Sequence, residues 1–189
     1  MILRGIARLA RGDAKGIEEF SGTLEAFSAS LAPLIAFPLA GAIITAMAGD
    51  WKMAIIGLLS RLCAVLALPV IVYEFARLFG RQAGWLRTAT ALNWCFWLVL
   101  PAILVAAFLG AFLVQLGLGM LDAQLAVLAL AGLYLLWNRW FIFKAGLGLG
   151  GGQAALMLLA SLAVTLALAA LPWAAGLPGL HHPSLSTLP

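Results

Sequence analysis

Five apolar segments dominate this sequence, and each is long enough to form a helix that crosses a bilayer. A membrane-spanning α-helix takes about 20 predominantly apolar residues. Segments of this kind occupy residues 27–48, 53–76, 88–114, 123–144 and 151–172. Of the 189 residues, 65% are hydrophobic and 10% are charged, whereas about 25% of the residues of a soluble domain are charged. We therefore predict an all-α, polytopic membrane bundle of five transmembrane helices.

The chain divides into three regions: a basic N-terminal segment at 1–25, the transmembrane domain at 26–173 and a Pro-rich tail at 174–189. In the first segment, the apolar residues Ile2, Ile6 and Leu9 lie on one side of a helix. The arginines lie largely on the other side, and they are Arg4, Arg8 and Arg11. That pattern suits a short amphipathic helix on an anionic leaflet. A solvated basic tail is the alternative.

The tail carries three prolines after residue 174 and no charge, which predicts a disordered or loosely surface-bound extension. It also holds the only two histidines, His181 and His182. No cysteine or carboxylate nearby completes a metal site, so we expect neither a metal nor a cofactor. Cys63 and Cys95 lie within separate apolar segments and are expected to be small core residues rather than a disulfide.

Basic residues alternate from one flank of the spans to the next. The N-terminal segment is basic, Arg77, Arg81 and Arg87 follow the second span, and Lys144 ends the fourth, whereas the other flanks contain only Lys52. Because cytoplasmic loops are enriched in Lys and Arg, we predict a cytoplasmic N-terminus and a C-terminus on the far side. The residues expected to contact anionic lipid headgroups are Arg4, Arg8, Arg11, Arg81, Arg87 and Lys144.

The net charge of +4 does not indicate a nucleic-acid partner. Nucleic-acid surfaces combine a basic stripe with stacking aromatic side chains. Here the basic residues form short clusters beside apolar segments. We expect no nucleic-acid binding, and we expect the anionic bilayer itself to be the partner of these charges.

Two arginines, Arg61 and Arg139, lie inside apolar spans. In this topology both spans run from outside to inside, so their side chains lean outward, toward the helix N-termini. Arg61, in the outer half of its span, can extend toward the nearer interface. Arg139 lies in the inner half and leans toward the membrane centre. An arginine at that depth costs at least about 2.5 kcal/mol, so we expect a polar contact from a neighbouring helix.

Few side chains qualify as that contact. Glu74 is the only carboxylate at a similar depth, although Arg77, three residues on, is placed to form a local ion pair with it. Asn93 lies at a comparable depth on the third span. We predict an inner-leaflet polar cluster of Glu74, Arg77, Asn93 and Arg139, with Arg61 as a further intramembrane polar residue. Its role stays open between holding helices together and forming a transport or ligand site.

The sequence shows no convincing catalytic motif. GLGLGG at residues 146–151 has the spacing of a dinucleotide-binding turn, but neither the preceding strand nor the following acidic residue that this chemistry requires. We interpret it as a connector between spans, with a lipid headgroup on the fifth helix as the alternative. No serine has a candidate base, and no pair of carboxylates lies at membrane depth. We therefore expect the protein not to be an enzyme.

The sequence combines a basic N-terminus, an Ala-rich last span and the segment LYLLWNRWFIFKAGLGLGGGQAALMLL. In these features the chain resembles the bacterial branch of the Yip-like (Ypt-interacting-protein-like) membrane proteins. The chain also contains the segments LARGDAKGIEEFSGTLEAFSASLAPLIAFPLAGAI and TALNWCFW. In these two segments it is similar to a set of small uncharacterised bacterial inner-membrane proteins. The likeness covers roughly Leu9 to Trp173. It implies a five-helix integral protein of the bacterial inner membrane, whose bacterial relatives mostly lack an assigned activity. In that membrane, the far side on which the basic flanks place the C-terminus is the periplasm. The Asp-Leu-Tyr-Gly-Pro segment of the eukaryotic family members is missing, so their association with small GTPases is not implied.

Two functions follow from these patterns. The first is a non-enzymatic scaffold or accessory subunit that packs against other membrane proteins, a second copy or lipid, for which Gly41, Ala107, Ala111 and Gly132 provide small packing residues. Ser161 and Thr165, one turn apart, are expected to offer hydroxyl groups to a neighbouring helix. The second is a small oligomeric transporter or channel in which Arg61 and Arg139 line an anion path. A cavity that reaches Arg139 favours the second function, and an arginine sealed against Glu74 or Asn93 favours the first.

Overall fold

A computed structural model describes residues 1–174 of the chain, and these residues form helices joined by short connections, with no strand among them. The elements are α1 (Ile2–Ala10), η1 (Ala14–Glu19), α2 (Leu24–Met47), α3 (Trp51–Leu78), η2 (Gln82–Gly84), α4 (Trp85–Cys95), η3 (Phe96–Leu98), α5 (Val99–Gln115), α6 (Met120–Leu147) and α7 (Gly151–Ala174). The all-α prediction is confirmed. The predicted tail, with His181 and His182, lies outside the described residues except for Ala174.

Within residues 1–174, five helical segments are long and apolar enough to cross a membrane, at the five predicted places. The protein is therefore a multi-pass membrane protein. Local signals explain where two of these helices begin. The Thr23 side chain accepts a hydrogen bond from the backbone N–H of Ala26 at 3.3 Å, and Asp50 accepts one from Met53 at 3.1 Å. Both are N-caps, which satisfy donors that the first turn of a helix leaves unpaired.

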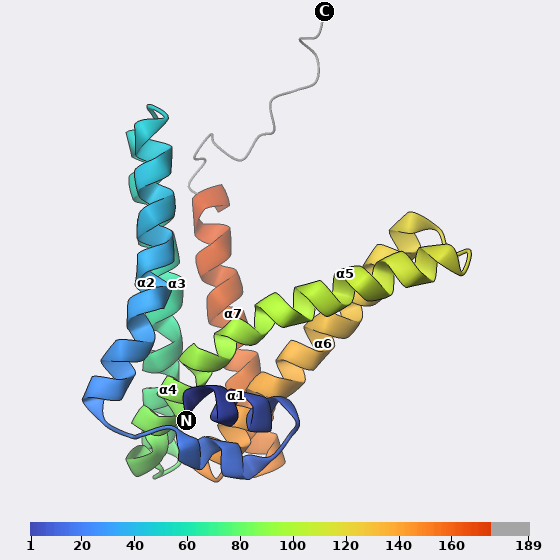
Figure 1. Ribbon diagram of the computed structural model, residues 1–189. Coiled ribbons are helices and arrows are strands. Elements are labelled where there is room, and N and C mark those ends of the chain that lie inside the picture. Colours follow the sequence, from blue (N-terminus) through green and yellow to red (C-terminus); the bar gives the residue numbers. More distant parts are fainter. Residues whose placement is uncertain (175–189) are drawn as a thin grey trace, which may run out of the picture.

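The third span is not one regular helix. It consists of α4 and α5, joined by the single 3-10 turn η3. Pro101 lies in the first turn of α5. Its ring removes the N–H that would bond to the carbonyl of Trp97, and it crowds that carbonyl. Figure 1 shows the result, because α4 lies at the base of the molecule and α5 leaves it in a different direction.

The long helices form two arms that separate away from a common base (Figure 1). The first arm is the hairpin of α2 and α3, with α7 packed against α3 and α6. The second arm is the hairpin of α5 and α6. At the base, α4 packs against α2, α3 and α6, and α1 with η1 lies across α4 and α6.

The buried core is concentrated in the base. Its members come from α1, η1, α3, α4, α6 and α7, and they are Leu9, Ile17, Phe20, Val72, Ala76, Ala91, Leu92, Cys95, Ile142, Phe143, Leu147, Leu149, Ala154 and Met157. By contrast, α5 has no buried residue. Lipid tails are as apolar as the side chains of the arms, so no hydrophobic force drives the arms together.

Glycines allow a close helix approach in the base. A Cβ atom added at Gly146 would overlap the Thr88 side chain, and one at Gly84 would lie 2.8 Å from the Gly146 carbonyl oxygen. Farther along the same glycine run, Gly148 adopts φ 62° and ends α6, which glycine permits without steric cost. Because the run lies between two helices, it is a helix connector. The dinucleotide-binding alternative, which needs a strand before the glycines, has no basis in the fold.

Candidate functional site

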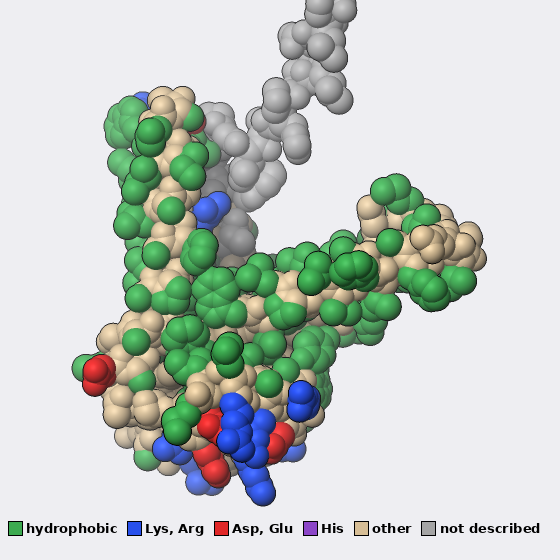
Figure 2. All heavy atoms as spheres, in the orientation of Figure 1, with side chains coloured by type: hydrophobic (Ala, Val, Ile, Leu, Met, Phe, Trp, Pro, Cys, Tyr) green, Lys and Arg blue, Asp and Glu red, His purple; other side chains and the backbone are tan. Residues whose placement is uncertain are grey.

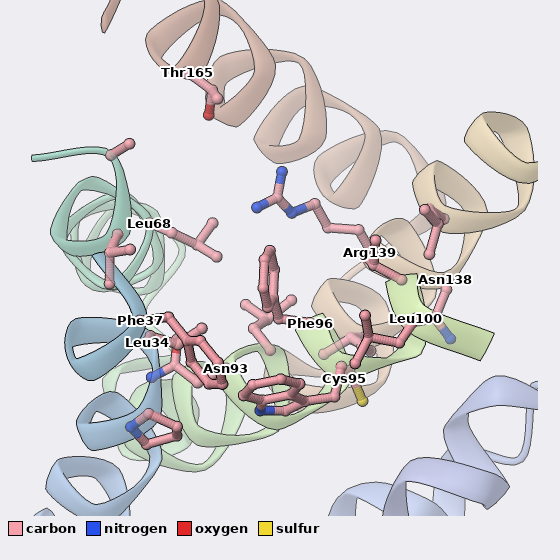
Figure 3. Close-up of a pocket in the computed structure, with 18 of the residues that line it drawn as sticks. Leu34, Phe37, Leu68, Asn93, Cys95, Phe96, Leu100, Asn138, Arg139 and Thr165 are labelled. Carbon is pink, nitrogen blue, oxygen red and sulfur yellow. The ribbon is translucent and has the colours of Figure 1, made fainter. Parts of the chain in front are cut away.

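A cavity of about 1060 Å³ lies where the two arms meet the base. Every long helix contributes to it, including Phe37 of α2, Leu68 of α3, Leu100 of α5 and Thr165 of α7 (Figure 3). Asn93 of α4 and Phe96 of η3 also line it. Most lining side chains are apolar. The cationic exceptions are Arg61 and Arg139. Both arginines that the sequence places inside spans therefore border one cavity.

Arg139 extends from α6 into this cavity, in the direction of Thr165 on α7 (Figure 3). It lies eight residues before the last residue of α6, Leu147, which is about 12 Å at 1.5 Å per residue. The structure gives it no ion pair and no hydrogen bond within residues 1–174. The expected polar contact from a neighbouring helix is therefore not among its described interactions.

Arg61 leaves α3 toward α2. Its Nη1 atom lies 3.3 Å from the position that a Cβ atom would occupy at Gly41. Gly41 is six residues before Met47, the end of α2, or about 9 Å along the helix. The side chain thus lies over the backbone of α2, where the absence of a side chain at Gly41 leaves room for the guanidinium.

The predicted cluster of Glu74, Arg77, Asn93 and Arg139 is not brought together. Glu74 is paired with Arg77 at 2.8 Å, one turn along α3, and both side chains are largely exposed. Asn93 is buried and donates a hydrogen bond to the Ser30 hydroxyl of α2 at 2.9 Å. Asn93 and Arg139 line the cavity, as does Arg61, the further intramembrane residue that we predicted, whereas Glu74 and Arg77 do not. The cluster does not form because Arg77, three residues along the same helix, already pairs with the Glu74 carboxylate.

The neutral polar groups around the cavity already have partners. The Asn93 amide donates to Ser30, and the Thr165 hydroxyl donates to the carbonyl of Ser161 on its own helix at 2.7 Å. Ser161 likewise bonds to the carbonyl of Leu158 at 2.8 Å. The expectation that the hydroxyl groups of α7 bond to a neighbouring helix is wrong, since the carbonyl three or four residues back is nearer.

Asn138, beside Arg139 in the sequence, points to the other side of α6 (Figure 3). Its amide donates to the carbonyl of Leu9 at 3.1 Å, and the Tyr134 hydroxyl donates to the carbonyl of Ala10 at 2.8 Å. These carbonyls lie at the C-terminus of α1, where a helix leaves acceptors unpaired, and the Leu9 carbonyl also accepts the backbone N–H of Gly12 at 3.0 Å. Tyr134 and Asn138 therefore fasten the N-terminal segment to α6. Sequence reasoning missed this role, although their (i, i+4) spacing on one face was visible.

The N-terminal segment is a helix packed on the bundle rather than a solvated tail. Leu9 is fully buried and Phe20 nearly so. Arg8 turns inward and pairs with Asp13 at 3.2 Å and with Glu19 at 3.1 Å, so it is less available to lipid than predicted. Arg4 also approaches Glu19, at 3.4 Å, while remaining largely exposed.

The other predicted headgroup contacts are exposed: Arg11, Arg81, Arg87 and Lys144. The Lys144 ammonium lies 5.3 Å from the centre of the Trp140 ring, a cation–π contact that suits a membrane boundary. Figure 2 shows charged side chains gathered at the end of the molecule where α1 and η1 lie, and mainly apolar side chains along both arms. The basic flanks therefore meet at one end, as the predicted topology requires. Which side of the membrane that end faces stays a prediction.

Both cysteines are free, Cys95 buried and Cys63 exposed. Within residues 1–174, no group of three or more His, Cys, Asp or Glu residues is placed to hold a metal ion. Comparisons with models of protein families, with curated proteins and with solved structures give no match. The function is therefore argued from the geometry of the chain itself.

Proposed function

We propose that the protein is a non-enzymatic scaffold or accessory protein of the bacterial inner membrane, whose α5–α6 arm packs against another membrane protein or a second copy of the chain. One observation carries this proposal. No residue of α5 is buried, and its packing within the chain is almost confined to α6 and η3. The α5 side of a transmembrane hairpin is thus presented to its surroundings.

The surface of the arm has features of a helix-packing surface. Ala107 and Ala111 are exposed on α5, one turn apart. Small residues at this spacing let a second helix approach closely in a membrane. An almost entirely apolar groove of about 430 Å³ follows the junction of the two helices, between Pro101 and Leu109 on α5 and Val127 and Tyr134 on α6. A partner helix would gain van der Waals contacts in this groove that fluid lipid makes less well.

The cavity supports a non-enzymatic role. Among residues 1–174, the candidate nucleophiles that line it are Cys95 and Thr165, and no carboxylate side chain from this part of the chain lines it to act as a base. The resemblance to the bacterial Yip-like branch is compatible with this role and assigns no activity. An inner-membrane location rests on that resemblance.

Site-specific crosslinking tests the proposed partner surface. A photoreactive residue at Phe108 or Phe112, both exposed on α5, should form a crosslink to one defined protein or to a second copy in intact cells. Ala107→Leu with Ala111→Leu should abolish that crosslink. Ala163→Leu, the same change at an exposed position on α7, should leave it intact. Crosslinks to lipid alone from both α5 positions would refute the proposal.

A second function, an anion path, is favoured by one observation: Arg61 and Arg139 border the same cavity. Flux of a small anion into liposomes that disappears in Arg139→Leu would support it. Against it, most of the lining is leucine, phenylalanine, proline and other apolar side chains. A hydrated anion would meet few hydrogen-bonding groups in this cavity that could replace the water molecules of its hydration shell.

A further inference from the structure

The cavity carries positive charge with no acidic side chain to balance it. The chain has seven acidic residues, Asp13, Glu18, Glu19, Glu25, Asp50, Glu74 and Asp122, and none of them lines the cavity. Arg139 has no described partner, and Arg61 lies against the glycine backbone of α2. A planar guanidinium without an acidic partner is suited to bind a carboxylate or phosphate through two parallel hydrogen bonds. An anion is therefore the complement of this site.

The neutral polar groups limit the size of the anionic head. Asn93, Asn138 and Thr165 each already donate one side-chain hydrogen bond within the protein. A headgroup rich in hydroxyl groups, such as a sugar, would leave its own polar atoms unpaired in an apolar cavity, and that is costly. A compact head, a carboxylate or a phosphate monoester, needs little beyond the guanidinium groups.

The rest of the cavity requires an apolar body. Leu34, Phe37, Leu68, Phe96 and Leu100 border the space into which Arg139 extends (Figure 3). Its volume of about 1060 Å³ is at the upper end of the range of small-molecule sites, about 300–1000 Å³. A small inorganic anion would fill only a little of this volume and would leave the apolar walls against water.

The arrangement of the arms gives such a molecule a route from the bilayer. On one side α7 packs against both α3 and α6, whereas α2 and α5 scarcely touch within the described residues. The two arms separate beyond the cavity (Figure 1). A hydrocarbon chain lying between the arms would therefore continue into surrounding lipid while its head stays at Arg139.

We propose that this cavity binds a long-chain anionic amphiphile with a compact carboxylate or phosphate-monoester head, held by Arg139 with Arg61, and with its chain along the apolar lining. The site requires both parts of the ligand. The charge pairs with the guanidinium groups, and the chain covers the walls. It does not depend on a protein partner at α5.

Binding to the purified full chain in neutral detergent tests this proposal. Oleate and oleoyl-lysophosphatidate are the probes, and they distinguish the two heads; saturable binding of either supports the site. Oleyl alcohol has the chain without the charge, and acetate and inorganic phosphate have the charge without the chain. Native mass spectrometry after removal of bound lipid counts the bound molecules. We expect one bound probe and weaker binding of all three comparison compounds.

The variants locate the site. Arg139→Leu should weaken binding by about tenfold or more, the value of one charged hydrogen-bonding group, and Arg139→Lys should fall between. Arg81→Leu removes an exposed arginine at the base and should bind like the original chain. Quenching by a bromine-substituted fatty acid should be reduced in Trp97→Phe, since Trp97 lines the cavity. Equal binding of oleyl alcohol, equal binding of inorganic phosphate, or unchanged binding by both Arg139 variants would overturn the proposal.

Discussion

Replacing Arg139 with leucine should stabilise the ligand-free protein. The side chain is directed into a mostly apolar cavity about 12 Å from the C-terminal end of its helix, with no described ion pair or hydrogen bond. An arginine near the centre of a transmembrane helix costs at least about 2.5 kcal/mol relative to water. Since the group is only partly buried, we expect about 1 to 2 kcal/mol of that cost to be recovered on substitution.

The sign of this effect separates two accounts of Arg139. Removing one member of a buried, hydrogen-bonded ion pair destabilises a protein by about 3 to 5 kcal/mol. The original expectation of a polar partner on a neighbouring helix therefore predicts a large loss of stability. The position of Arg139 in an apolar cavity, without a described partner, predicts instead that Arg139→Leu slightly raises the free energy of unfolding.

Reversible unfolding in mixed micelles provides the measurement, with tryptophan fluorescence as the signal and lipid removed beforehand. Arg139→Lys keeps the charge and should gain little, and Arg81→Leu controls for the loss of any one arginine. Saturating oleate should reduce or cancel this difference, because a ligand at a hundred times its Kd stabilises the folded state by about 2.7 kcal/mol. The leucine variant, with about tenfold lower affinity, should gain only about 1.4 kcal/mol at the same concentration. A ligand-free loss of more than about 1 kcal/mol in Arg139→Leu would refute the reasoning.

Four further outcomes follow from the structure. Asn138→Ala should weaken the attachment of α1 by about 1 kcal/mol, seen as faster amide exchange in residues 2–20 while the long helices exchange as before. Gly146→Ala should cost about 1 to 3 kcal/mol because its methyl group has no room against α4, whereas Gly152→Ala, with nothing near its added carbon, should be neutral or slightly stabilising. Pro101→Ala restores a backbone donor at the break in the third span and should lengthen the distance between spin labels on α4 and α5. A reporter that requires the periplasm should be active at the C-terminus and silent at the N-terminus; the reverse result would exclude the topology.

Helix existence and position were predictable because they depend on local properties of the chain. Mean hydropathy of +1.10 and runs of about 20 apolar residues identify spans whatever their neighbours are. The cap at Thr23 and the ion pair of Glu74 with Arg77 are also local, formed within one helical turn. Short-range geometry of this kind can be derived from residue spacing alone.

Which polar residues meet was decided only by the tertiary structure. Asn138 and Arg139 are adjacent, yet one holds the N-terminal helix and the other enters the cavity. Asn93 bonds to Ser30 across 63 positions of sequence. Hydropathy gives the depth of a residue in the membrane but not the rotation of its helix, and rotation is set by close packing such as that of Gly146 on Thr88. In lipid, no hydrophobic force closes the arms, so the cavity between them is a property of the whole fold.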